Sequence, residues 1–87
     1  MTLRIDKAAR GEFTIFVLSG RIEADHIAEL TRVLELETNL RKIVLDLKET
    51  KLVDRDAIRF LVRCEADGVK LENCPGYVRK WMKKEKG

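Results

Sequence analysis

The amino-acid sequence predicts an α/β fold in which a mixed four-stranded sheet, opened by an N-terminal hairpin, carries its helices mainly on one face. Two apolar runs, residues 13–18 and 43–47, are too short for helices and rich in β-forming side chains, as buried strands are. Apolar residues at helical spacing follow each run, over 24–38 and 54–66. The pattern predicts the order strand, strand, helix, strand, helix, strand, helix, with parallel strands joined by helical crossovers.

The hairpin joins an alternating edge strand to the first apolar run. Leu3 and Ile5 alternate with charged neighbours, and a turn containing Gly11 follows. The helix over 24–38 then presents one apolar stripe to the sheet and charged residues to water. This inner stripe is predicted to comprise Ala24, Ile27, Ala28, Leu30, Thr31 and Leu34.

The helix over 54–66 combines an apolar stripe with an arginine stripe. Arg55, Arg59 and Arg63 recur four residues apart on the face opposite the apolar side chains, as in a helix lying on a sheet. Gly68 follows and can take the left-handed conformation that ends a helix.

The C-terminal part predicts a brief strand over 69–72 and a last helix. Pro75 marks the start of this helix, because proline is well placed in the first helical turn. Its apolar stripe is predicted to pack inward and comprises Tyr77, Val78, Trp81 and Met82.

Size and composition predict one folded domain over residues 1–87. The chain of 87 residues is 45% hydrophobic and 38% charged, which is the balance of a folded domain and not of a disordered one. Its apolar runs are far shorter than the about 18 residues of a membrane span, so we expect a cytoplasmic protein without membrane insertion. Cys64 and Cys74 lack zinc-ligand spacing and are predicted to be reduced thiols.

The positive charge is concentrated at the C-terminus. Residues 75–87 carry a net charge of +4, whereas the rest of the chain carries −1. A basic segment with two aromatic residues could bind nucleic acid or an acidic membrane. Cations are also favoured at a helix C-terminus by the helix dipole, and the aromatic residues share the predicted inner stripe, so we expect no nucleic-acid partner.

Asp54 and Asp56 lie in the first turn of the helix over 54–66, directly after a strand and a turn. Carboxylates there can cap the free backbone N–H groups and interact favourably with the helix dipole, by about 0.3–1 kcal/mol. A helix start at the end of a strand is also a natural position for an anion or a phosphate.

This region resembles the STAS domain, the family of sulphate-transporter tails and anti-sigma-factor antagonists. The resemblance rests on an apolar strand followed by Asp46, Leu47, Leu52, Val53, Asp54, Ala57, Ile58, Leu61 and Cys64. A second landmark of the family, an apolar strand followed by Gly-x-Leu-Asp, is similar to Gly20-Arg21-Ile22-Glu23. The resemblance implies a STAS-like fold.

The resemblance also implies a regulatory position. In regulatory members the turn usually reads Asp-Ser-Ser-Gly, and a partner kinase that is also the anti-sigma factor phosphorylates the second serine. Here the four positions are Asp54, Arg55, Asp56 and Ala57, so Asp56 replaces the phosphorylatable serine and Ala57 replaces glycine.

Function in parallel α/β sheets lies beyond the carboxyl ends of the strands. There the sequence gathers several acidic residues that could also suit Mg²⁺, but we expect neither a metal nor a cofactor. The only histidine, His26, has no nucleophile at a local spacing, so an enzyme is not predicted. The predicted partner surface comprises Arg21, Glu23, Asp25, Asp54, Arg55, Asp56, Ala57 and Arg59.

The leading hypothesis is a non-enzymatic protein-interaction domain whose partner is, by resemblance, an anti-sigma factor of the serine-kinase type. Asp56 would then either imitate the phosphorylated serine permanently or meet a partner surface that has changed to accept it. The alternative is a small structural STAS subunit of a transport ATPase or of a stress-signalling complex. A homodimer stays open.

Overall fold

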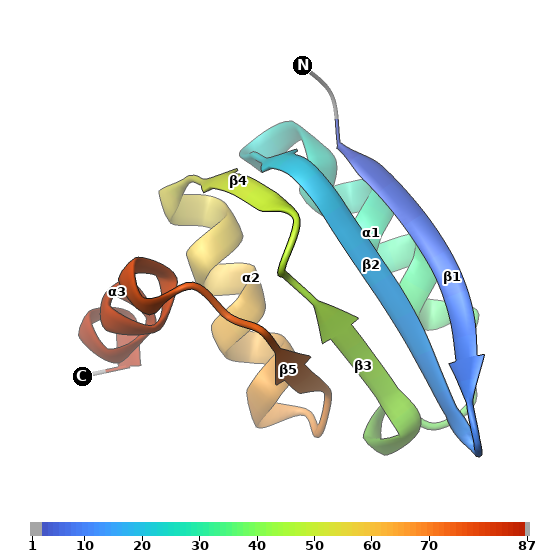
Figure 1. Cartoon of the computed structure of the whole chain (residues 1–87). Helices are drawn as coiled ribbons and strands as arrows, with labels where there is room; N and C mark the ends of the chain where they lie inside the picture. Colours follow the sequence, from blue (N-terminus) through green and yellow to red (C-terminus); the bar gives the residue numbers. More distant parts are fainter. Residues whose placement is uncertain (1–2, 87) are drawn as a thin grey trace.

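The sheet is built around a long central strand, and the computed structural model describes residues 3–86 of the chain (Figure 1). β1 (Arg4–Arg10) and β2 (Phe13–Ile22) form the predicted antiparallel hairpin. β3 (Ile43–Asp46) pairs with β2 in parallel, and β5 (Lys70–Glu72) pairs with β3 in parallel. The predicted mixed sheet with an N-terminal hairpin is therefore confirmed.

A fifth strand, β4 (Thr50–Val53), forms where the sequence predicts a turn. It pairs in parallel with the last residues of β2, so β3 and β4 together act as one strand interrupted in the middle. The carboxylate of Asp46 accepts a hydrogen bond from the Lys48 N–H at 3.0 Å, and this bond stabilises the turn between β3 and β4. The Thr50 hydroxyl donates to the Leu18 carbonyl at 2.8 Å, which fixes the resumed strand beside β2.

The first helical segment begins as a 3₁₀ turn, Ala24–His26, and continues as α1 (Ile27–Glu35). The change of winding alters which side chains face the sheet. Leu30 is buried as predicted, whereas Ala28 is exposed. The helix ends at Glu35, before the predicted end at Thr38. The Glu37 N–H donates to the Leu34 carbonyl, only three residues earlier, so the last turn is tighter than an α-helical turn.

α1 and α2 (Arg55–Ala66) lie on the same face of the sheet, and α3 (Gly76–Lys86) lies beside α2 (Figure 1). α2 ends as predicted, with Gly68 at a φ of +106°. A further 3₁₀ turn, Leu40–Lys42, leads into β3. None of the helices within residues 3–86 has both the length and the apolar character that crossing a bilayer requires.

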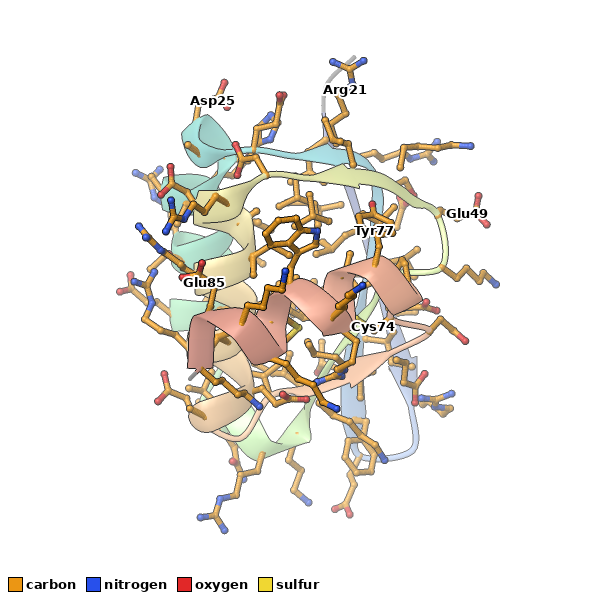
Figure 2. All side chains as sticks on the ribbon, turned by 90° about the vertical axis from the view of Figure 1, so that its left-hand side faces the viewer. Arg21, Asp25, Glu49, Cys74, Tyr77 and Glu85 are labelled. Atoms are coloured by element: carbon orange, nitrogen blue, oxygen red, sulfur yellow. The ribbon has the colours of Figure 1, made fainter. Side chains whose placement is uncertain are left out.

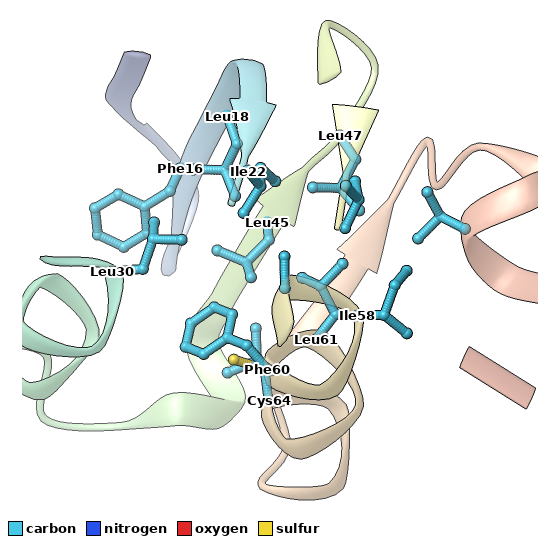
Figure 3. Close-up of a cluster of buried hydrophobic side chains, with 14 of the residues drawn as sticks. Phe16, Leu18, Ile22, Leu30, Leu45, Leu47, Ile58, Phe60, Leu61 and Cys64 are labelled. Atoms are coloured by element: carbon cyan, nitrogen blue, oxygen red, sulfur yellow. The ribbon is translucent and has the colours of Figure 1, made fainter. Parts of the chain in front are cut away.

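The core fills the space between the sheet and the helices. Along β2, Phe16 and Leu18 face inward and are almost fully buried. Figure 3 shows these side chains gathered with those of the two helices. The other main members are Ile22, Leu30, Ile43, Leu45, Leu47, Ile58, Phe60, Leu61, Val78 and Met82.

On the opposite face of the sheet, two central residues are covered by the chain itself. Ile15 and Val44 are paired neighbours on this face, and only 9% and 1% of their surfaces are exposed. The Arg10 guanidinium of β1 donates to the Glu72 carboxylate of β5 at 2.6 Å. The two edge strands of the sheet are thus linked by a polar contact. The burial of these two residues therefore does not depend on a second protein chain.

α3 differs from the sequence prediction in the direction of its aromatic residues. Val78 and Met82 are fully buried, whereas 44% of Tyr77 and 53% of Trp81 are exposed. The prediction of one inward stripe of four residues is therefore wrong. On a helix of 11 residues beside α2, only the narrow stripe of positions 78 and 82 reaches the core.

Candidate functional site

Asp54 connects two helical segments at the carboxyl ends of β2 and β4. One of its carboxylate oxygens accepts a hydrogen bond from the Ala57 N–H at 2.9 Å and so caps α2. The other accepts from the Ala24 N–H at 2.8 Å, at the start of the 3₁₀ turn. Both oxygens are engaged with backbone groups, so Asp54 positions the site and has a structural role in it.

Glu23 and His26 cap the 3₁₀ turn. The Glu23 N–H donates to Nδ1 of His26 at 3.1 Å, and the His26 N–H donates to the Glu23 carbonyl at 2.9 Å. Donor atoms of Glu23, Asp25 and His26 also lie within 4.8 Å of one another, a spacing that a metal ion could use. Because Nδ1 of His26 already accepts a backbone hydrogen bond, we assign this group to capping.

Asp56 lies in the first turn of α2 with 61% of its side chain exposed. Its carboxylate is 3.9 Å from the nearest guanidinium nitrogen of Arg59, one turn further along the helix. A partner could therefore reach this carboxylate, and no rearrangement of the core would be needed.

Glu85 of α3 meets two of the α2 arginines. Its carboxylate accepts a hydrogen bond from Arg59 at 3.0 Å and forms an ion pair with Arg55 at 3.4 Å. The hydrogen bond from Arg59 and the charges of both arginines lower the pKa of Glu85. All three groups are near the surface, so this network could exchange its partners for those of another protein.

The remaining predicted site residues fall into two groups. Arg21 and Asp25 are exposed at one end of the molecule, as Figure 2 shows, because β2 and β4 end side by side. Ala57, in contrast, is fully buried. It cannot contact a partner directly and acts only through the start of α2.

A groove of about 760 Å³, which the sequence pattern did not predict, lies beside this site. Leu52, Tyr77 and Trp81 are large apolar residues that are exposed there. The groove is lined by Leu52, Val53, Arg55, Ile58, Tyr77, Trp81, Lys84 and Glu85. Figure 2 looks onto α3 and shows Tyr77 and Glu85 toward its two ends.

One signal in the sequence could have revealed the groove. Tyr77, Trp81, Lys84 and Glu85 recur at helical spacing and so form a second stripe beside the buried Val78. A short helix that touches the core with one stripe leaves such a second stripe at the surface.

Asp46 is held in a structural hydrogen-bond network. It accepts hydrogen bonds from the Lys48 N–H and from the side-chain amide of Asn73, both at 3.0 Å. Partial burial by itself would raise the pKa of Asp46, but these bonds and the charges of Lys48 and Arg10 together lower it.

The fold is similar to that of solved structures. The chain matches the crystal structure of an antisigma-factor antagonist, STAS domain, from Rhodobacter sphaeroides with a TM-score of 0.55 and 11% identity, over 82% of this chain and 84% of that one. It matches the crystal structure of Mglu with a TM-score of 0.62 and 22% identity, over 82% of this chain and 19% of Mglu. The chain thus spans about a fifth of the length of Mglu.

The predicted STAS-like fold is confirmed by the match with the STAS domain. No protein-family model matches the sequence, and a comparison with curated proteins finds no match.

Proposed function

We propose that this chain is a non-enzymatic, cytoplasmic protein-interaction domain of the anti-sigma-factor antagonist kind. Its partner is an anti-sigma factor of the serine-kinase type, and the docking surface is the start of α2, comprising Asp56, Arg55 and Arg59. The observation that carries this proposal is the exposed carboxylate of Asp56 in the first helical turn. The STAS-like fold supports the assignment.

Asp56 is proposed to supply a fixed negative charge at the position where regulatory relatives carry a removable phosphate. A phosphoserine carries about −1.5 to −2 charges at neutral pH, whereas the carboxylate carries one. Arg59 is 3.9 Å away and offsets part of this charge. The domain is therefore expected to lack a phosphorylation cycle at this position.

The role of the neighbouring residues follows from their contacts. Because both oxygens of Asp54 hold backbone N–H groups, Asp54 keeps the docking surface in place. Arg55 and Arg59 share the Glu85 carboxylate near the surface, so an acidic group of the partner could compete for them.

The test is to measure the affinity of the chain for a serine-kinase anti-sigma factor from the same genome by titration calorimetry. Asp56→Ser and Asp56→Ala are compared with the unchanged chain. Glu29→Ala is the matched control, because Glu29 is an exposed acid in the first turn of the other sheet-covering helix. If Asp56 controls docking, the two variants at position 56 change the affinity and the control does not.

A second candidate is a fixed structural subunit within a larger assembly, such as a transport ATPase or a stress-signalling complex. The match with only 19% of Mglu favours it, because the fold there forms a minor part of a longer chain. Stable co-purification with such an assembly, unaffected by substitution at Asp56, would support this alternative.

A further inference from the structure

The groove between β4 and α3 combines apolar walls with a cationic margin. Leu52 is 42% exposed on β4, and it faces the exposed aromatic residues of α3 across the groove. Of the four large hydrophobic residues that are exposed in the described part of the chain, three lie here. Such clustering of exposed apolar surface marks an interaction site more strongly than scattered residues do.

The lining of the groove suits a protein segment. Its aliphatic lining comes from Leu52, Val53 and Ile58, which belong to a strand and to the neighbouring helix. A groove between packed elements accepts the apolar face of an amphipathic helix, with anchors at helical spacing. Trp81 and Tyr77 are residue types that often dominate the binding energy of such contacts.

The charges around the groove indicate an acidic occupant. Lys84 lies over the ring of Trp81, with its ammonium nitrogen 4.9 Å from the ring centroid. Lys80 lies outside the lining, one helical turn before Lys84, and within residues 3–86 neither lysine forms an ion pair with a carboxylate. Glu85, the one acid in the lining, is already paired with Arg55 and Arg59.

Two other occupants fit these charges less well. A second copy of the chain docked groove to groove about a twofold axis would bring Glu85 as the one acid of its lining, and that carboxylate is already paired with Arg55 and Arg59. Nucleic acid would require open aromatic faces for stacking bases, but the Lys84 ammonium covers a face of Trp81.

We infer that this groove binds an acidic amphipathic segment of a partner protein, with apolar side chains seated between Leu52 and Trp81 and carboxylates near Lys80 and Lys84. The inference deepens the proposed function, because Arg55 belongs to both the groove and the α2 surface. The inference rests on one part of the proposed function, which is that the chain is a protein-binding domain. It requires no switch at Asp56.

The experiment is selection from a displayed library of random peptides of about 16 residues, long enough for an about 24 Å helix. A parallel selection uses the Trp81→Ala variant. Enriched peptides are then labelled, and their affinity is measured by fluorescence anisotropy. Variants Trp81→Ala and Leu52→Ser are compared with Leu36→Ser, because Leu36 is 77% exposed outside the groove.

We expect enriched peptides with apolar residues three or four positions apart, flanked by Asp and Glu. Trp81→Ala and Leu52→Ser should each weaken binding at least about tenfold, as for a central hot spot. Leu36→Ser should leave the affinity within about twofold. Lys84→Glu should weaken binding, whereas Arg32→Glu, the same charge change at an exposed position of α1, should not. Thermal unfolding of each variant confirms that it is folded.

The inference is overturned if the Trp81→Ala selection yields the same peptides, or if neutral or basic peptides are enriched. It is also overturned if a single-stranded oligonucleotide or a phosphatidylglycerol vesicle binds in a Trp81-dependent way and the selected peptides do not. These outcomes involve no anti-sigma factor. A result that overturns peptide binding in the groove is therefore distinguishable from one that overturns the proposed role of Asp56.

Discussion

The carboxylate of Asp54 accepts a hydrogen bond from the backbone N–H of Ala24 at 2.8 Å, across 30 positions of the sequence. Its other oxygen caps α2 through the Ala57 N–H. One side chain thus fixes where two helical segments begin relative to each other. Because these segments start beyond the ends of adjacent strands, Asp54 holds the whole candidate surface in place.

Asp54→Ala is expected to lower the free energy of unfolding by about 1–3 kcal/mol, through loss of the cap and of the bond to Ala24. Asp56→Ala, two positions later and exposed, should change it by less than about 1 kcal/mol. Urea unfolding followed by circular dichroism measures both. Equal losses for the two variants would contradict the structural role of Asp54.

Acid should weaken the attachment of α3 to α2 through Glu65. The Glu65 carboxylate accepts hydrogen bonds from Arg79 at 2.9 and 3.0 Å and from Lys86 at 3.3 Å. Partial burial alone would raise the pKa of Glu65, but these bonds and charges together hold it below its ordinary value of 4.5. The stabilisation is therefore present above pH 4.5 and is lost as the pH falls through the lowered pKa.

The measurement is urea unfolding of the unchanged chain and of Glu65→Gln between neutral pH and about pH 3. Because 30–39% of the Glu65 and Arg79 side chains is exposed, the difference at neutral pH should be less than about 1 kcal/mol. The difference in the free energy of unfolding between the two proteins should decrease in acid. If the difference grows as the pH falls, the predicted direction of the pH dependence is wrong.

The thiol of Cys64 should be unreactive in the folded protein. Burial, together with the charge of Asp67, raises the pKa of Cys64 to about 12, so little thiolate exists at pH 8. Cys74 is only half-buried, and burial raises its pKa as well. Timed labelling with iodoacetamide and mass spectrometry should therefore modify Cys74 first and Cys64 only on unfolding, and rapid labelling of Cys64 would refute this.

Gly68 should tolerate a side chain less well than Gly11 does. Both have positive φ, but a Cβ on Gly68 would lie 2.9 Å from Cγ of Arg41, whereas nothing lies within 4 Å of one on Gly11. Gly68→Ala should cost about 1–3 kcal/mol from backbone strain and crowding. Gly11→Ala should cost about 1–2 kcal/mol, from strain alone. Thermal unfolding compares them, and an equal cost would exclude crowding by Arg41.

Much of the sheet could be predicted because apolar runs and helical spacing are local signals. Phe16 and Leu45 lie in strands that their sequence neighbours predict, and Gly68 ends α2 as expected. β4 could not be predicted in this way. It forms because Asp46 closes the interruption before it and Thr50 bonds to the carbonyl of Leu18 on another strand.

The candidate site shows the same division between local and long-range information. The position of Asp56 in the first turn of α2 follows from a local pattern. The engagement of Asp54 with Ala24 depends on how β2 and β4 are paired. The direction of Trp81 depends on which side of α3 packs against α2, and both stripes of that helix are apolar enough to be the inner one.

We propose that the negative charge of Asp56 controls docking of an anti-sigma factor. The most direct test of this proposal is the dissociation constant of that complex for the unchanged chain, Asp56→Ala and Glu29→Ala, measured side by side. We expect a change of at least about tenfold for Asp56→Ala, equivalent to about 1.4 kcal/mol, and no change for Glu29→Ala. Identical dissociation constants for all three proteins would contradict it.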